Sequence, residues 1–174
     1  SLAKLLMNMG EADKAEKTLK TAAKAVPGNS DVMTNLGLIQ LLNREFEAGW
    51  QNYNHRFGGL MIDYFTTRHP HMRNVSPDRF SKLWEGKSKC KKLLIWPDQG
   101  IGDEVMFATI LQHFKPDFPV TVQLDNRLLD LFQSSLPNFD FKSSQASLDF
   151  ADFSHHLPLG QLPSLLLNDL SKFH

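Results

Sequence analysis

The sequence has few of the features that mark a disulfide-bonded, membrane-spanning or strongly charged protein. Its 174 residues contain one cysteine, Cys90, which excludes an intramolecular disulfide framework and fits a reducing, cytoplasmic setting. Lysine plus arginine and aspartate plus glutamate number 19 each, so no overall field attracts nucleic acid or an acidic membrane. No apolar stretch approaches the roughly 20 residues of a membrane span. We therefore expect no nucleic-acid partner and no membrane span.

The start of the chain also lacks the pattern of a secretory signal peptide. Its first residues, SLAKLLMNMGEADK, have no basic segment followed by a long apolar core. The first residue is serine, and a helical pattern is already under way there. We expect the chain to be a piece of a longer protein.

The first quarter of the chain contains a helical pattern that repeats. Small and large residues recur after a shift of 34 residues, so that Leu2, Ala3, Leu6, Ala15 and Leu19 correspond to Leu36, Gly37, Gln40, Gly49 and Tyr53. Small residues allow two helices to cross closely, and large residues fill the space beside the crossing. This pattern resembles the tetratricopeptide repeat (TPR), of which about one and three-quarter copies are present.

Turn residues separate the predicted helices. Gly10 with Glu11 marks the first turn, the segment after Pro27 the second, and Asn43 with Arg44 the third. We predict Ser30 or Asp31 as the N-cap of the third helix.

The helix predicted from Glu45 to about Arg56 carries aromatic residues at helical spacing. They are Phe46, Trp50, Tyr53 and Phe57. We interpret them as a hydrophobic seam that docks the helices onto the next domain, in preference to an aromatic ligand platform. Arg56 and His55 have no partner in view, and we expect them at the solvated rim of this seam.

A connecting segment is predicted over residues 58–90. An unstructured loop of this length is unusual, so part of it should form short helix or wrap another surface. His69 and His71 have no neighbours that complete a ligand set, and we expect no metal site there. Trp84 should anchor a turn before the next strand. His155 and His156 are adjacent in a predicted strand, where their side chains diverge.

The last part of the chain, residues 91–174, alternates strands and helices. The buried strand over Leu93 to Trp96 is followed by a tight turn in which two glycines can take positive φ, and by a helix from Asp103. Further strands are predicted over residues 119–124, 139–142 and 151–157, with a helix over 126–136 and a final turn and helix. This order predicts a partial Rossmann-like parallel sheet, about half of a doubly wound domain. The fold class is therefore α + α/β, with TPR-like hairpins first.

The glycine turn leaves several interpretations open. A dinucleotide site needs G-x-G-x-x-G; Gly100 and Gly102 supply the first two glycines, but Val105 occupies the third position. Asp125, at the end of the second strand, could then hold a ribose hydroxyl. Alternatively, the glycines serve only a tight turn between strand and helix. A third interpretation depends on the order of motifs along the chain.

Four segments carry that order: Gly49 to Arg56, Leu83 to Lys92, Asp98 to Asp103, and Leu157 to Pro163. They resemble the G-W-x-x-Y-x-x-R helix, the W-x-G-x-x-L-x-G-K-like approach, the E-Q-G-x-G-D turn and the P-L-x-x-L-P segment of bacterial TPR proteins fused to a GT-B glycosyltransferase domain. The chain departs from this pattern in three respects. Asp98 replaces the usual glutamate, the second half of the approach is degraded, and the C-terminal GT-B domain is absent.

The resemblance implies transfer of a sugar from a nucleotide-sugar donor to a protein or glycan acceptor, in a cleft between two Rossmann-like domains. Asp103 matches a position proposed as general base in related heptosyltransferase-type enzymes, although helix N-capping explains an aspartate there equally well. The backbone N–H groups of Gln99, Gly100, Ile101 and Gly102 would face the donor diphosphate. No cofactor or metal is implied. Without the second domain, the chain is expected to be inactive alone.

A competing interpretation is a protein-binding module. The helices would then recognise a peptide on a concave surface, and the α/β part would be a non-catalytic platform. Lys4, Asn8 and Asn35 are the candidate contacts.

Overall fold

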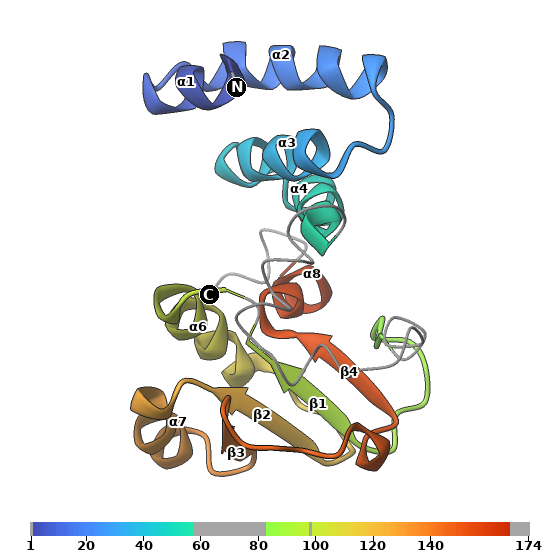
Figure 1. Ribbon diagram of the computed structural model, residues 1–174, viewed down its shortest axis with the longest axis vertical. Helices are drawn as coiled ribbons and strands as arrows, with labels where there is room; N and C mark the ends of the chain where they lie inside the picture. Colours follow the sequence, from blue (N-terminus) through green and yellow to red (C-terminus); the bar gives the residue numbers. More distant parts are fainter. Residues whose placement is uncertain (1, 58–82, 98, 168–174) are drawn as a thin grey trace. The chain divides into compact units, whose positions relative to one another are not determined.

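The computed structural model describes residues 2–57, 83–97 and 99–167, and these fall into two compact units. One unit comprises residues 1–64 with 167–174, and the other comprises residues 65–166. In its described part the first unit is helical, whereas the second carries the sheet (Figure 1). Helices with an α/β part were predicted. The two loop histidines, His69 and His71, lie outside the described residues.

The helical unit consists of successive helices that pack on their neighbours in the chain. Their bounds are α1 Leu2–Asn8, α2 Ala12–Ala25, α3 Ser30–Leu42 and α4 Phe46–Tyr53, which continues as the 3₁₀ turn η1 Asn54–Phe57. The core shared by α1, α2 and α3 is formed by Ala3, Ala15, Leu19, Leu36 and Ile39. Most of these are the positions at which the 34-residue pattern places small or large apolar residues.

The turns between these helices lie where the sequence predicts them, but one cap differs. Gly10 and Arg44 adopt positive φ, 76° and 64°, in the first and third turns. The N-cap of α3 is Asn29, whose side-chain oxygen accepts from the Val32 N–H at 3.1 Å. The prediction of Ser30 or Asp31 as N-cap was therefore wrong, because the helix begins one residue after the asparagine that satisfies its free N–H.

The crossing of α3 and α4 depends on two glycines. A Cβ atom added to Gly37 would lie 2.3 Å from the Tyr53 backbone nitrogen and 2.7 Å from the Gly49 carbonyl oxygen. At Gly49 an added Cβ would lie 2.8 Å from the Leu41 side chain. Backbones can approach this closely only where no side chain intervenes, which is the role that the sequence pattern assigned to small residues.

The end of α4 contains a buried arginine that the sequence analysis placed wrongly. Arg56 is only 1% exposed, and its guanidinium lies 4.3 Å from the centroid of the Tyr53 ring. One guanidinium nitrogen donates to the Asn54 side-chain oxygen at 3.1 Å. Arg56 is therefore not a solvated rim residue, because an aromatic face and polar neighbours replace the water around its charge. Trp50, in the same helix, donates from Nε1 to the Leu167 carbonyl at 3.0 Å.

The second unit contains four parallel strands in the order β3-β2-β1-β4. The strands are β1 Leu93–Trp96, β2 Val120–Leu124, β3 Asp140–Ser143 and β4 His155–Pro158. The two central strands, β1 and β2, are buried throughout, as expected for a parallel sheet covered on both faces. The parallel pairing confirms the prediction drawn from alternating strands and helices.

Helical segments connect the strands. After β1 comes α6 Ile101–Ala108 with the 3₁₀ segment η4 Thr109–His113, and after β2 come η5 Asn126–Leu128 and α7 Leu129–Ser135. Figure 1 shows α6 and α7 on the same side of the sheet, as successive right-handed crossovers require. The fourth strand is shorter than predicted, since residues 150–152 form the 3₁₀ turn η6. After β4, η7 Leu159–Gln161 leads into α8 Leu162–Leu166.

Trp84 anchors the turn that precedes β1, as predicted. Its backbone N–H donates to the His156 carbonyl at 2.9 Å, and its ring nitrogen donates to the Ser88 carbonyl at 3.1 Å. Its ring packs against those of Phe114 and Phe118. Among the residues described here, no helix is both long and apolar enough to cross a bilayer.

Candidate functional site

The strand order reverses beside β1. The chain passes from β1 to β2 and β3 on one side, and then returns to pair β4 with the opposite side of β1. In open α/β sheets, ligands bind outside the carboxyl ends of the strands at such a reversal. Two segments leave the sheet there: the turn after β1, which leads into α6, and η7 after β4. The glycine turn singled out by the sequence is the first of them.

The backbone of the glycine turn differs from the prediction. Gly100 is the N-cap of α6 with φ −80° and ψ 168°, and Gly102 lies within the first helical turn. The positive-φ glycines in the described part of the chain are Gly10, Gly28 and Gly86. The positive φ that glycine permits is therefore not used at Gly100 or Gly102, because the helix begins at Ile101, two residues earlier than predicted.

The two glycines, which carry no side chains, nevertheless leave open space at this turn. Among the described residues, a Cβ atom on Gly102 would have no heavy atom within 4 Å, and one on Gly100 would meet only Asp103 Oδ2, at 3.6 Å. Packing thus does not require glycine here, in contrast to Gly37. The N–H groups of the first helical turn have no carbonyl one turn earlier to bind. An anion could approach them through the space that Gly102 leaves.

Asp103 lies in the first turn of α6, half-buried, and is already engaged. Its Oδ2 accepts from the Gly100 N–H at 3.2 Å, which is a capping interaction. No hydrogen bond to its other oxygen, Oδ1, is found in the part of the chain that the structure describes. One carboxylate can thus cap the helix and still offer an oxygen outward. The cap occupies the Gly100 N–H, so the N–H groups of Ile101 and Gly102 remain for a ligand.

The other residues of the predicted site lie beside this turn. Gln99 and Ile101 are half-buried. Asp98, which replaces the glutamate of the resembling family, lies outside the described residues. Residues 99–103 thus lie together at the carboxyl edge of the sheet, which follows from their being consecutive residues of one turn.

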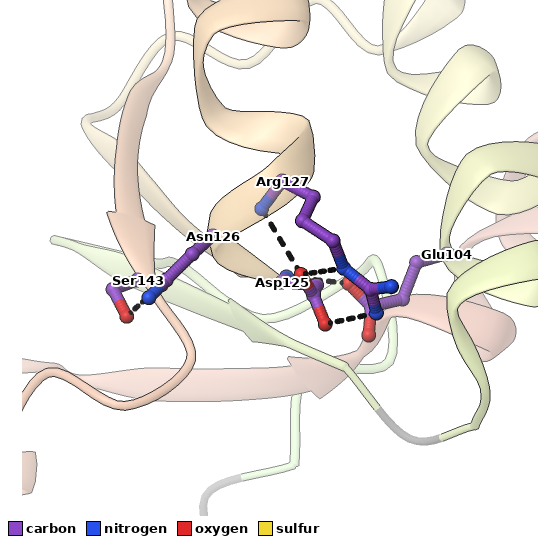
Figure 2. A network of polar contacts seen from close by, with 5 residues as sticks. All are labelled: Glu104, Asp125, Asn126, Arg127 and Ser143. Atoms are coloured by element: carbon purple, nitrogen blue, oxygen red, sulfur yellow. Dashed lines mark hydrogen bonds and ion pairs between the residues drawn. The ribbon is translucent and has the colours of Figure 1, made fainter.

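Glu104 contributes a contact that the sequence analysis did not foresee. This carboxylate is 6% exposed, and its Oε2 accepts from the Asp125 backbone N–H at 2.7 Å (Figure 2). It therefore ties the first turn of α6 to the end of β2. The sequence identified Glu104 only as an anion favoured by the helix dipole, because the two partners are 21 residues apart.

Asp125 and Arg127 form a bidentate ion pair next to Glu104 (Figure 2). The Arg127 Nε and Nη2 atoms donate to the two carboxylate oxygens of Asp125, each at 2.9 Å. The Arg127 side chain, and then its backbone N–H, lower the pKa of Asp125 to about 2. Both oxygens of Asp125 thus already accept from Arg127, so a ribose hydroxyl would have to share this carboxylate with the arginine. Beyond them, the Ser143 hydroxyl donates to the Asn126 side-chain oxygen, which links the ends of β2 and β3.

On the other side of β1, η7 carries a buried glutamine. Gln161 is 9% exposed, and its Oε1 is enclosed without a hydrogen-bond partner. The segment η7 packs against α6. Both segments start from the carboxyl edge of the sheet, so Gln161 lies on the side of β1 opposite to Asp125. Gln161 was not singled out from the sequence, although it lies next to Gly160 in the motif segment Leu157 to Pro163, because nothing local shows that its amide is buried.

The histidines of β4 have separate environments. His156 is buried, and its Nδ1 accepts from the Trp96 ring nitrogen at 3.1 Å. His155 Nε2 lies 3.2 Å from the Ser88 hydroxyl. No group of three or more histidine, cysteine, aspartate or glutamate side chains that could hold a metal occurs within the described ranges. The two adjacent side chains diverge, as predicted for a strand.

The residues suggested for peptide recognition give little support to that role. The Asn35 side-chain nitrogen donates to the Asp31 carbonyl of its own helix at 2.6 Å. Asn8 is exposed at the end of α1, and the Lys4 side chain is outside the described part. Asn35 therefore contributes to α3 itself.

Fold and site together define a chain with a helical unit and an α/β unit built on a four-stranded parallel sheet. No protein-family model matches the chain, and no solved structure matches it significantly. Among curated proteins, the chain is similar to protein FlbA of Caulobacter vibrioides, with 27% identity over 143 residues. The match covers 77% of this chain and 22% of FlbA, so the chain spans about a fifth of the length of that relative.

Proposed function

We propose that this chain is part of a TPR-linked glycosyltransferase of the GT-B type, in which a sugar passes from a nucleotide-sugar to an acceptor hydroxyl. The observation that carries the proposal is the turn between β1 and α6. It lies at the reversal of the strand order, leaves open space at Gly102, and offers one free oxygen of Asp103. The α/β unit is then the first half of a Rossmann-like donor or acceptor domain, and the helices are the last of a repeat array.

Each residue of the turn has a defined role in this proposal. The N–H groups of Ile101 and Gly102 bind an oxygen of the donor diphosphate, with Gln99 and Gly100 beside them. Asp103 Oδ1 accepts the proton of the acceptor hydroxyl. The acceptor oxygen forms a bond to the anomeric carbon. The bond from that carbon to the diphosphate breaks, and its electron pair leaves with the nucleoside diphosphate.

The same geometry explains why the second domain would be needed. The N-terminus of α6 would by itself attract the diphosphate, but the Asp103 carboxylate places a negative charge there. This carboxylate also already accepts from the Gly100 N–H. The two remaining N–H groups, those of Ile101 and Gly102, add little binding energy compared with the repulsion between this carboxylate and the diphosphate. Most of the donor affinity must then come from residues outside this chain, and we expect the chain alone to be inactive.

The base assignment is tested with Asp103→Asn in the full-length protein. Asparagine keeps an oxygen that can accept from the Gly100 N–H, so the melting temperature should stay nearly unchanged. It cannot take a proton, so sugar transfer should be abolished. Asp130→Asn is the matched control, because Asp130 is an exposed aspartate in the first turn of α7 and should keep full activity. Transfer by Asp103→Asn at the parent rate would show that Asp103 only caps the helix.

A further inference from the structure

The strongest unexplained feature at the carboxyl edge of the sheet is the side-chain amide of Gln161. Its carbonyl oxygen is enclosed and has no hydrogen-bond partner. No hydrogen bond of its amide nitrogen is found either, within the part of the chain that the structure describes. The backbone carbonyl of this residue, in contrast, accepts from the Ser164 hydroxyl at 2.7 Å. Neither the oxygen nor the nitrogen of the side-chain amide is therefore hydrogen-bonded to a described part of the protein.

A buried amide without partners is unfavourable and calls for a physical reason. Buried polar groups are nearly always hydrogen-bonded, and an unpaired one lowers the stability of the fold. A hydrophobic side chain of similar size would fill the same space at less cost. Residues that break such a rule are found preferentially at functional sites. The location agrees with this, because Gln161 follows β4, the strand that flanks the reversal of strand order.

The chemistry of the amide narrows the kind of ligand. A glutamine side chain presents one acceptor and one donor next to each other. Neighbouring hydroxyl groups on a sugar ring offer the same pair in complementary order. The amide nitrogen is not among the enclosed unpaired atoms, and rotation about the last side-chain bond exchanges oxygen and nitrogen without any backbone movement. The carbonyl can thus be turned towards an incoming hydroxyl.

We propose that the side-chain amide of Gln161 is a carbohydrate-binding group that hydrogen-bonds to sugar hydroxyls at the carboxyl edge, on the β4 side of the glycine turn. This inference rests on the proposed function and adds a second contact to it. The glycine turn binds the charged part of the ligand, and Gln161 binds a neutral, hydroxyl-bearing part. The sugar belongs either to the donor or to a glycan acceptor, and the two sources give different kinetics.

The first test measures stability and needs no ligand. Gln161→Met in the 174-residue chain removes the unpaired amide and keeps a flexible side chain of similar length. We expect a melting temperature that is unchanged or raised by roughly 2–4 °C, because no hydrogen bond is lost. Gln133→Met is the matched control in α7, where the amide nitrogen lies 3.5 Å from the Phe139 carbonyl, and it should change the melting temperature little. If Gln161→Met clearly lowered the melting temperature and Gln133→Met did not, the Gln161 amide would be structural and the proposal would be overturned.

The second test uses the full-length protein with UDP-glucose, UDP-N-acetylglucosamine and GDP-mannose as probes, and free UDP and GDP for comparison. If the donor sugar contacts Gln161, Gln161→Met should weaken binding of the accepted nucleotide-sugar about tenfold and leave binding of the free nucleotide unchanged. If the acceptor contacts it, the KM for the acceptor should rise about tenfold with the donor KM unchanged. Equal constants in the parent and variant would overturn the role of Gln161 alone. Failure of the parent protein to bind any of the probes would overturn both proposals.

Discussion

Replacing Gly37 by alanine should disrupt the crossing of α3 and α4. The new Cβ atom would lie 2.3 Å from the Tyr53 backbone nitrogen, 2.7 Å from the Gly49 carbonyl oxygen and 2.8 Å from the Tyr53 Cα atom. All three are backbone atoms, so no side-chain rotation relieves the overlap. Non-bonded heavy atoms prefer about 3.5–4.0 Å, so α4 would have to move away by roughly an ångström. That movement would open the packing around Tyr53 and Arg56.

The size of the effect follows from two opposing contributions. Alanine is favoured over glycine inside a helix by about 1 kcal/mol. Overpacking typically costs about 1–3 kcal/mol and more where the neighbours cannot move. Because backbone blocks the Cβ, we expect an overpacking cost of about 3–4 kcal/mol, above the typical range, and hence a net loss of about 2–3 kcal/mol in the free energy of unfolding. Gly49→Ala should lose less, since its Cβ meets the Leu41 side chain first, at 2.8 Å.

The assay is urea unfolding of the chain, followed by far-UV circular dichroism. Gly102→Ala is the matched control, because its Cβ would meet nothing within 4 Å and it too lies in a helix. It should be as stable as the parent or more stable by up to about 1 kcal/mol. If Gly37→Ala unfolded at the same urea concentration as Gly102→Ala, the close crossing of α3 and α4 would be refuted.

Three further predictions concern the carboxyl edge of the sheet. Gly102→Ala should keep stability but reduce nucleotide-sugar binding by the full-length protein, measured by calorimetry, because the Cβ fills the space over the N–H groups. Glu104→Ala should lose about 1–3 kcal/mol in urea unfolding, because the Asp125 N–H loses its acceptor, whereas Glu104→Gln keeps an acceptor and should lose less. Asp125→Asn should lose at most about 1 kcal/mol at pH 7, because its partner Arg127 is 71% exposed.

The pH dependence of the Asp125 variant has a defined sign. The pKa of Asp125 is lowered from 3.8 to about 2 in the folded chain, first by the Arg127 side chain. The ion pair therefore stabilises the fold fully above the unfolded pKa, and this contribution disappears as the pH falls from about 4 to 2. The stability difference between parent and Asp125→Asn should shrink over that range. A stability difference that stayed constant from pH 7 to pH 2 would contradict the ion pair.

The other two predictions have equally definite contrary outcomes. Unchanged nucleotide-sugar binding by Gly102→Ala would exclude this turn as the ligand site. Equal losses of stability for both Glu104 variants would exclude the hydrogen bond between Glu104 and the Asp125 N–H.

Much of the secondary structure could be predicted from the sequence because it depends on local patterns. The apolar run Leu93 to Trp96 and the β-branched run that ends at Leu124 form central strands, since their side chains suit a sheet buried on both faces. The turn glycines were identified by type, but their φ angles were not. The start of α6 at Ile101 depends on the cap that Asp103 provides. The same residues are compatible with a helix that begins one or two positions later, so the sequence alone does not fix the first residue of the helix.

The buried polar residues show where local patterns fail. Arg56 has the composition of a surface residue, yet it is enclosed because Tyr53 and Asn54 fold back over its guanidinium. Glu104 was recognised as a helix-start anion, whereas its partner is supplied by the end of a different strand. Gln161 lies in the motif segment Leu157 to Pro163, but no sequence pattern marks its side chain as buried and unpaired. Burial is a property of what surrounds a side chain, and that is set by segments distant in the sequence.

Local sequence patterns are enough to predict the helical repeat, the alternation of strands and helices, and a glycine turn that leads into a helix with an acidic first turn. These follow from the periodicity of apolar residues and from the conformational preferences of single residues. The pairing of β4 with β1 emerges only in the folded chain, where it creates the reversal of strand order, places η7 against α6, and leaves the Gln161 amide unpaired. The physical reason is that strand pairing and burial depend on the joint packing of many segments, which no single stretch of chain specifies.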